Sequence, residues 1–305
     1  SVGSSAVPAS PGPCASAPGS ATPLPTGQRA CRQPVNLIVA GHMAKESALS
    51  SQHNSEPLVS TCILTYQHEP FISQAIDGAL AQQCTFDYEI IICDDGSSDG
   101  TQEICRSYAA KYPDKIKLLS NDKNLGINAN AMQLFMNAKG KYIAICEGDD
   151  FWVDSEKLQK QVFFMQDNPD YTITASSSRV INNEGLTVTK TTLPAKQMQI
   201  KDFAINNFLG QNTASIVFRK TCIHPDVVRI LAAAPFLDWA LSLVCLSQGS
   251  GFCFSDVMSV YRTHSQGKWT SMTEEQQSNG FAKMQEFIAR EFVQEESETT
   301  LNSKA

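Results

Sequence analysis

Three carboxylates stand within four residues of this chain, in segment 147–150, which reads Glu-Gly-Asp-Asp. Carboxylates this close repel one another, so the cluster is costly unless a cation neutralises it. Magnesium and manganese prefer carboxylate oxygens and leave positions open for phosphate oxygens. The segment therefore predicts a divalent-cation site that can neutralise a departing diphosphate, with a solvated acidic turn as the alternative.

A second polar cluster occupies segment 94–101, which reads Asp-Asp-Gly-Ser-Ser-Asp-Gly-Thr. Turn formation and helix capping account for Ser98, Asp99 and Thr101. They do not account for Asp94, which follows an apolar run typical of a buried strand. A carboxylate at that place can accept a hydrogen bond from the N–H edge of a nucleotide base such as uracil.

Apolar, β-branched runs alternate with helical spacing of apolar residues in the first half of the chain. We expect strands at 58–66, 88–93, 116–119 and 142–146, and helices at 71–82, 101–112 and 127–138. This alternation predicts an α/β fold with a mostly parallel central sheet flanked by helices. Ligands of such sheets bind beyond the carboxyl ends of the strands, which is where both polar clusters fall.

The second half of the chain has a less regular pattern. We expect helices at 156–166 and 238–246, strands at 171–182, 213–218 and 252–261, and a turn at 183–185. Residues 293–305 are polar and acidic, which is typical of a frayed tail.

Composition excludes several classes of protein. The chain has 305 residues, 42% of them hydrophobic, and a formal net charge of -7, which argues against a protein that coats nucleic acid or anionic lipid. No apolar run reaches the roughly 20 residues that span a bilayer, and the start lacks the pattern of a secretory signal. The ten Cys include no CxxC pair, so we expect buried free thiols in a reducing, cytoplasmic setting rather than disulfides or a zinc site.

Four segments occur in an order that resembles the inverting glycosyltransferases of family 2: 65–70, 94–101, 124–126 and 147–150. Each motif alone is weak, whereas the ordered set is specific. The resemblance implies the GT-A fold and transfer of a sugar from a nucleotide-diphosphate sugar, with UDP- or dTDP-type donors favoured. The acceptor would be a hydroxyl of a glycan or lipid-linked glycan in surface polysaccharide synthesis, met by peripheral contact with the inner membrane face.

The resemblance also implies a domain at 43–292, with a nucleotide-binding half at 57–150 and an acceptor and catalytic half at 151–292. Residues 1–42 hold half of the chain's 14 prolines, mixed with Ser, Ala and Gly, and cannot bury enough apolar surface to fold alone. Because Gly41, His42 and Met43 resemble a cloning junction, we interpret 1–42 as a disordered tag or linker, with a natural leader as the alternative.

The family's nucleotide-binding positions carry over onto five residues of this chain. Thr65, Tyr66 and Glu69 would line the base and the ribose. Asp94 would bind the base, and Asp95 is a weaker candidate at the same place.

The family's metal site carries over onto segment 147–150 and a later loop. Asp149 would be the main ligand of Mn²⁺ or Mg²⁺, and Glu147 stands where the family has the first Asp of its Asp-x-Asp motif. Asp150 would orient the metal shell or meet the acceptor. His264 would bind the metal or the diphosphate once its loop closes, although an exposed loop His is the alternative.

The catalytic base and the diphosphate contacts lie in the second half. Asp238 takes the position of the base, with a helix N-cap as the structural alternative. Arg262 and Lys268 would pair with diphosphate oxygens. The family's Ala-Arg-Asn is replaced at 128–130 by Asn-Ala-Asn, so another cation such as Lys123 would have to substitute for the Arg.

Two rival functions remain open from the sequence. A nucleotide-sugar-binding protein that has lost catalysis would fit the missing Arg and the Glu147 substitution. A sugar-nucleotide pyrophosphorylase would need a Gly-rich phosphate loop after the first strand, where this chain has Thr65 and Tyr66. A dinucleotide-binding oxidoreductase is excluded, because that place lacks a Gly-x-Gly-x-x-Gly turn.

Overall fold

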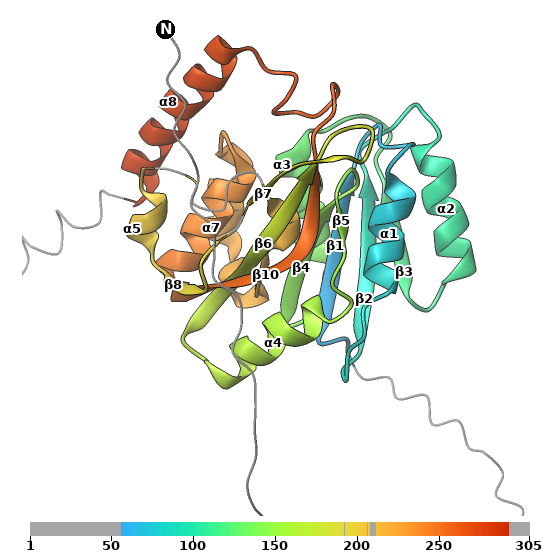
Figure 1. Ribbon diagram of the computed structural model, residues 1–305, viewed down its shortest axis with the longest axis horizontal. Helices are drawn as coiled ribbons and strands as arrows, with labels where there is room; N and C mark the ends of the chain where they lie inside the picture. The colour runs from blue at the N-terminus through green and yellow to red at the C-terminus, as the bar shows by residue number, and fades with distance from the viewer. Residues whose placement is uncertain (1–55, 192, 206, 208–211, 293–305) are drawn as a thin grey trace, which may run out of the picture. The chain divides into compact units, whose positions relative to one another are not determined.

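The computed structural model describes residues 56–191, 193–205, 207 and 212–292. The sequence-based assignments at 1–42 and 293–305 therefore lie outside the described residues. Within the described part, the two halves of the chain contribute strands to one continuous sheet (Figure 1).

The first half confirms the predicted alternation of strands and helices. Its elements are β1 (Val59–Thr65), α1 (Ile72–Leu80), β2 (Tyr88–Asp94), α2 (Thr101–Lys111), β3 (Ile116–Ser120), α3 (Ile127–Asn137) and β4 (Tyr142–Glu147). All seven residues of β1 are buried, as expected of a strand covered on both faces. The buried residues of α1 follow helical spacing, at Ile72, Ala75, Ile76 and Ala79.

The second half contains more elements than the sequence pattern predicts. They are β5 (Phe151–Trp152), α4 (Lys157–Asp167), β6 (Tyr171–Ile181), β7 (Thr187–Thr191), β8 (Lys196–Met198), α5 (Ile200–Phe203), η1 (Thr213–Ser215), β9 (Val217–Arg219), η2 (Lys220–Cys222), α6 (Pro225–Ala233), α7 (Leu237–Ser247), β10 (Ser250–Arg262) and α8 (Glu274–Phe292).

The expected strand at 213–218 is wrong over its first half, which forms the 3₁₀ turn η1. The side chain of Ser215 donates to the carbonyl of Asn212 at 2.8 Å, and its backbone N–H donates to the same carbonyl at 3.1 Å. This local bonding competes with strand pairing, so the strand β9 begins only at Val217.

The sheet runs in the order β3-β2-β1-β4-β9-β6-β10-β5. Its first four strands are parallel, as predicted. Beyond β4 the pairing is mixed: β9 is antiparallel to both neighbours, whereas β6 and β10 are parallel. Because these strands are parallel, the carboxyl ends of β1, β2 and β4 lie at the same end of the sheet. The loop from β10 to α8 runs over this end (Figure 1).

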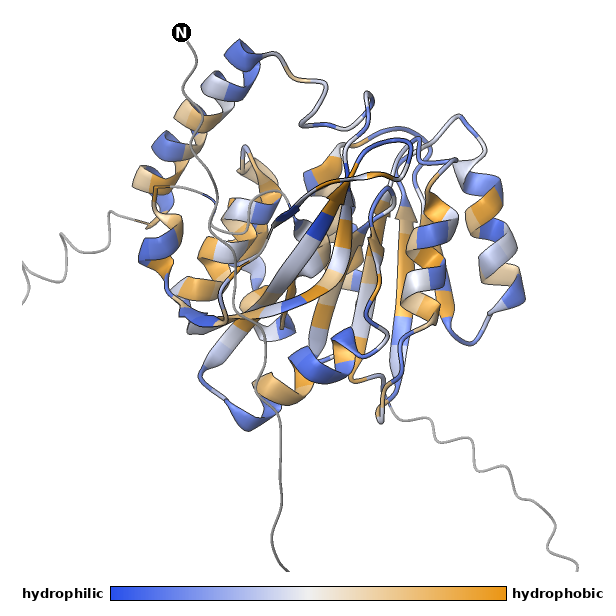
Figure 2. Ribbon diagram, in the orientation of Figure 1, coloured by the Kyte–Doolittle hydropathy of each residue, from blue (hydrophilic) through white to orange (hydrophobic). Residues whose placement is uncertain are grey.

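The core forms two layers on opposite faces of the sheet. Alternate residues of β1 divide between them, with Cys62 and Leu64 on one face and Val59 and Ile63 on the other. Apolar residues accordingly concentrate along the central strands (Figure 2). The cysteines in the described residues are all free thiols, and all but Cys84 are buried, as expected. None of the described helices is long and apolar enough to cross a membrane.

Candidate active site

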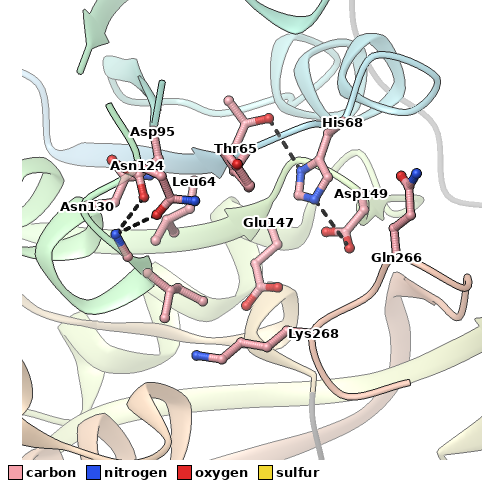
Figure 3. Close-up of a pocket in the computed structure, with 13 residues that line it drawn as sticks. Leu64, Thr65, His68, Asp95, Asn124, Asn130, Glu147, Asp149, Gln266 and Lys268 are labelled. Atoms are coloured by element: carbon pink, nitrogen blue, oxygen red, sulfur yellow. Dashed lines mark hydrogen bonds and ion pairs between the residues drawn. The ribbon is translucent and has the colours of Figure 1, made fainter. Parts of the chain in front are cut away.

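A cleft of about 320 Å³ lies at the carboxyl ends of β1, β2 and β4. Thr65, Tyr66, Asp95 and Glu147 are among its lining residues, as the sequence predicts (Figure 3). A smaller cavity of about 100 Å³ adjoins it and is lined by Asp238. The two cavities share Glu147, Asp149 and Lys268, so the predicted site residues of both halves of the chain meet here.

Asp149 stands between two imidazoles. Its Oδ2 lies 3.0 Å from Nε2 of His264 and 3.7 Å from Nε2 of His68. Burial acts to raise the pKa of Asp149, but the two histidines hold it below its ordinary value. Within the described residues, its other oxygen, Oδ1, is buried without a hydrogen-bond partner. Asp149 and His264, both expected from the sequence to bind the metal, are therefore in direct contact.

The donor set of Asp149 and His264 fits a divalent cation. The described residues contain no group of three or more His, Cys, Asp or Glu side chains arranged as a preformed metal site. An octahedral cation with bonds of about 2.1 Å separates adjacent ligands by roughly 3.0 Å, and the two atoms of this pair are 3.0 Å apart. The unpartnered Oδ1 of Asp149 adds a further donor atom. These residues would supply part of a coordination shell that leaves room for phosphate oxygens.

Glu147 reaches into the space between the two cavities. Burial raises its pKa to about 8, and the charges of Asp149 and Asp238 add to the effect, while Thr213 and Lys268 oppose it. A nearby cation would reverse this balance. Glu147 and Asp149 are thus close enough to interact electrostatically, and a metal contact of Glu147 stays a prediction.

Arg262 forms hydrogen bonds with Asp150 and with the backbone of Asp149. The backbone N–H of Arg262 donates to Oδ1 of Asp150 at 2.9 Å, and its Nε donates to the carbonyl of Asp149 at 3.0 Å. The guanidinium also lies over the ring of Phe71 and donates to Gln74. Arg262 lines the smaller cavity, but these contacts hold its side chain against residues 149–150. They are an alternative to the predicted diphosphate contact.

The two carboxylates at the end of β2 occupy different places. Asp95 lines the cleft and accepts hydrogen bonds from the side chain of Asn121 and from the N–H groups of Leu125 and Gly126, each at 2.9 Å. Asp94 is fully buried away from the cleft lining and accepts from Ser97 at 3.0 Å. The sequence made Asp94 the stronger candidate for a base contact, but Asp95 is the one of the two that lines the cleft.

Glu69 and Lys123, like Asp94, are predicted binding residues that line neither the cleft nor the smaller cavity. The carboxylate of Glu69 accepts from the N–H of Gly100 at 2.9 Å, while its own N–H donates to Asp99 at 3.1 Å. This reciprocal pair joins the loop after β1 to the start of α2, so Glu69 has a structural role. Lys123 is exposed, and its backbone packs against Gly96, whose φ is +74°.

Asn128 and Asn130, which replace the family's Ala-Arg-Asn, bind backbone carbonyls. The side chain of Asn128 donates to Ala234 at 2.8 Å, and that of Asn130 donates to Cys93 at 3.0 Å. Neither can supply the missing positive charge. Among the described residues that line the cleft, Lys268 is the only Lys or Arg, so it rather than Lys123 is placed to compensate.

Asp238 lies in the first turn of α7 and lines the smaller cavity. The side chain of Asn207 donates to its Oδ2 at 2.6 Å. Burial raises the pKa of Asp238, and its hydrogen bonds and Lys268 oppose the rise. A carboxylate with a raised pKa beside a cavity suits a general base.

His68 is a site residue to which the sequence analysis gave no role. It lies in segment 65–70, and its ring lines the cleft opposite Gln266 (Figure 3). The signal was a His three residues after the last residue of a buried strand. This position indicates a role for His68 only once the fold places Asp149 beside its ring.

Comparison with known proteins finds relatives over more than half of this chain. An uncharacterized protein of Mycobacterium tuberculosis is 33% identical over 216 residues, 70% of this chain and 61% of that protein. The Escherichia coli UDP-Glc:alpha-D-GlcNAc-diphosphoundecaprenol beta-1,3-glucosyltransferase WfgD is 30% identical over 172 residues, 55% of this chain and 62% of that enzyme. The chain thus spans about three fifths of the length of these curated relatives.

Solved structures confirm the predicted GT-A fold. S. aureus TarS 1-349 in complex with UDP-GlcNAc superposes with a TM-score of 0.54 at 16% identity, over 70% of this chain and 61% of that chain. The pattern that defines Glycosyl transferase family 2 matches residues 60–227, more than half of the sequence. The chain therefore belongs to glycosyl transferase family 2.

Proposed function

We propose that this protein is a divalent-cation-dependent, inverting glycosyltransferase that moves a sugar from a nucleotide-diphosphate sugar to a hydroxyl of a glycan. The observation that carries the proposal is the junction of the two cavities. Asp149, paired with His264, stands at this junction together with Lys268, and Asp238 lines the smaller cavity. Metal, leaving-group and base functions thus have one candidate side chain each.

The proposed reaction divides among these side chains. A cation held by Asp149 and His264 would neutralise the charge that develops on the diphosphate. Lys268 pairs with a diphosphate oxygen. Asp238 accepts the proton of the acceptor hydroxyl as its oxygen attacks the anomeric carbon opposite the diphosphate. The sugar–phosphate bond breaks while the new glycosidic bond forms, so the configuration inverts.

Uridine or thymidine diphosphate sugars are the proposed donors, and a lipid-linked glycan is the proposed acceptor. The UDP-GlcNAc complex of TarS and the UDP-Glc donor of WfgD support a uridine donor. The diphosphoundecaprenol acceptor of WfgD supports a lipid-linked glycan, which the enzyme would meet at the inner membrane face. Oδ2 of Asp95 accepts a single hydrogen bond in the described part of the chain and has capacity for a base N–H.

Donor binding by an Asp149→Ala variant tests the proposal. Titration calorimetry with UDP, dTDP and GDP, each with and without Mn²⁺, should show Mn²⁺-dependent binding to the wild type that Asp149→Ala loses. Asp167→Ala, at an exposed acid on α4, is the matched control and should bind as the wild type does. Equal affinity of Asp149→Ala and wild type in Mn²⁺ would overturn the metal assignment. Binding without sugar transfer would favour the degenerate binding protein.

A further inference from the structure

The side chain of His68, in the segment after β1, faces the same oxygen of Asp149 as His264, which follows β10. Its Nε2 lies 3.7 Å from Oδ2 of Asp149, too far for a hydrogen bond but within reach of a shared cation. The ring centroids of His68 and His264 are 6.3 Å apart, with an interplanar angle of 81°. Two imidazole nitrogens and one carboxylate oxygen therefore converge on the same small volume.

The orientation of His68 is fixed by its surroundings. Its Nδ1 lies 3.3 Å from Oγ1 of Thr65, and its backbone N–H donates to Thr101 at 2.9 Å. A Cβ on Gly148 would approach Oγ1 of Thr65 to 2.6 Å and Nδ1 of His68 to 2.8 Å, so only glycine leaves room for this ring. The ring is thus seated with Nδ1 toward the protein and Nε2 toward Asp149 (Figure 3).

The distances suit a common cation. Adjacent ligands of an octahedral ion stand roughly 3.0 Å apart and opposite ligands roughly 4.2 Å apart when bonds are about 2.1 Å. The 3.0 Å separation of His264 from Oδ2 of Asp149 matches adjacent ligands, whereas the 3.7 Å separation of His68 lies between the adjacent and the opposite spacing. Small side-chain rotations would complete the shell, and a nucleotide diphosphate would fill the remaining positions.

We infer that His68 is a metal ligand, which together with Asp149 and His264 forms a two-imidazole, one-carboxylate face. This inference rests on the proposed metal-dependent function and adds the identity of a ligand and a metal preference. Imidazole nitrogen suits transition ions, whereas Mg²⁺ prefers all-oxygen shells. The site therefore selects Mn²⁺ over Mg²⁺.

Two substitutions separate metal binding from a purely structural role. In His68→Asn the amide nitrogen takes the place of Nδ1 and keeps the contact with Thr65, but no donor remains at the place of Nε2. In His68→Gln the amide oxygen reaches toward the place of Nε2 and offers Mg²⁺ an oxygen ligand. His224→Ala removes an exposed imidazole at the start of α6 and is the matched control.

Pulsed electron paramagnetic resonance of Mn²⁺ with UDP or GDP counts the coordinated imidazole nitrogens in the full chain. We expect two in the wild type and in His224→Ala, and one in His68→Asn. Mn²⁺ affinity should fall about tenfold or more in His68→Asn, and the preference for Mn²⁺ over Mg²⁺ should shrink in His68→Gln.

Three results would overturn the inference in different ways. If one coordinated imidazole nitrogen is counted in both the wild type and His68→Asn, and both bind Mn²⁺ equally well, His68 is not a ligand. The proposed function would still stand. If His68→Gln prefers Mn²⁺ over Mg²⁺ as strongly as the wild type does, His68 does not cause the metal preference. Failure of the wild type to bind Mn²⁺ with any nucleotide removes the proposed metal dependence itself.

Discussion

Asp238 lines the smaller cavity, has a raised pKa and accepts a hydrogen bond of 2.6 Å from Asn207. An Asp238→Asn variant keeps the size of the side chain and the oxygen that accepts this bond. It cannot accept the proton of an acceptor hydroxyl. We expect donor affinity within about twofold of wild type and a transfer rate lower by about 100-fold or more, measured as nucleoside diphosphate release with acceptor present.

Asp256→Asn, which changes an exposed acid on β10, is the control for this substitution and should leave the rate unchanged. A transfer rate of Asp238→Asn within about threefold of wild type would remove Asp238 as the base.

The same residue predicts a pH-dependent change in stability. Because burial raises the pKa of Asp238, the associated stability is present below the ordinary pKa of an Asp and is lost as pH rises through the raised value. The neutral Asp238→Asn side chain avoids this loss. Since about 1 kcal/mol shifts Tm by about 2–4 °C in a domain of this size, we expect Asp238→Asn to melt a few degrees above wild type at pH 7.

At pH 4, close to the ordinary pKa of an Asp, the difference in Tm between the two proteins should be much smaller than at pH 7. Glu147 and Lys268 face the same space, so each pH is compared between the two proteins rather than within one. A Tm gain that is equal at pH 4 and pH 7 would contradict the pKa explanation.

Sequence spacing predicted the residues that meet at the site but not all of their roles. Asp149 was found because it belongs to a cluster of three carboxylates after a buried strand, and Asp238 was found through the resemblance to family 2. The hydrogen-bond partners that engage Arg262 and Glu69 come from distant parts of the chain, whereas Asp94 accepts from Ser97 and Gln102, which follow it closely in the sequence. Such partners are a property of the folded structure, so pattern alone could not show that these side chains are occupied.

At the scale of elements, the loop from Asn121 to Gly126 depends on Asp95. Three donors of this loop converge on one buried carboxylate. An Asp95→Ala variant removes this acceptor from Asn121 and Leu125, at about 1–3 kcal/mol for each donor that water cannot reach, whereas the N–H of Gly126 keeps its bond to Asn124. We expect a loss of at least about 2 kcal/mol in the free energy of unfolding, measured by urea denaturation, together with loss of nucleotide binding.

Asp122→Ala removes an exposed carboxylate from the same loop and should change neither quantity. Wild-type stability in Asp95→Ala would show that the loop is held by other contacts.

The elements of the first half were predictable because strand and helix periodicities alternate there without interruption. The second half was harder, because β5, β7 and β8 have only two to five residues and too few positions to establish a period. Helix α8 has mean polar character, and its buried residues are confined to Met284, Phe287 and Ile288. Its packing depends on aromatic contacts, such as Phe281 with Trp269, that sequence spacing does not reveal.

At the scale of the whole molecule, one sheet carries both the nucleotide side and the catalytic side of the site. Thr65, Asp95 and Asp149 lie at or just after the carboxyl ends of β1, β2 and β4, the proposed base Asp238 lies on α7, and His264 follows β10. Residues 1–42 have a composition that cannot form a core of its own. We expect a protein that begins at Met43 to keep its Tm within about 2 °C and its nucleotide affinity within about twofold.

Differential scanning calorimetry and calorimetric titration of the shortened chain check this expectation. Loss of cooperative unfolding would show that the segment contributes to the fold.

The central claim is that the cleft binds a nucleotide diphosphate through a divalent cation. A thermal-shift panel of UDP, dTDP, GDP and their sugar conjugates, each with and without Mn²⁺, tests it most directly. The account predicts a rise in Tm with one nucleotide class, seen only when Mn²⁺ is present, because a ligand that binds the folded state stabilises it. The absence of a shift with every nucleotide, or the same shift without metal, would contradict it.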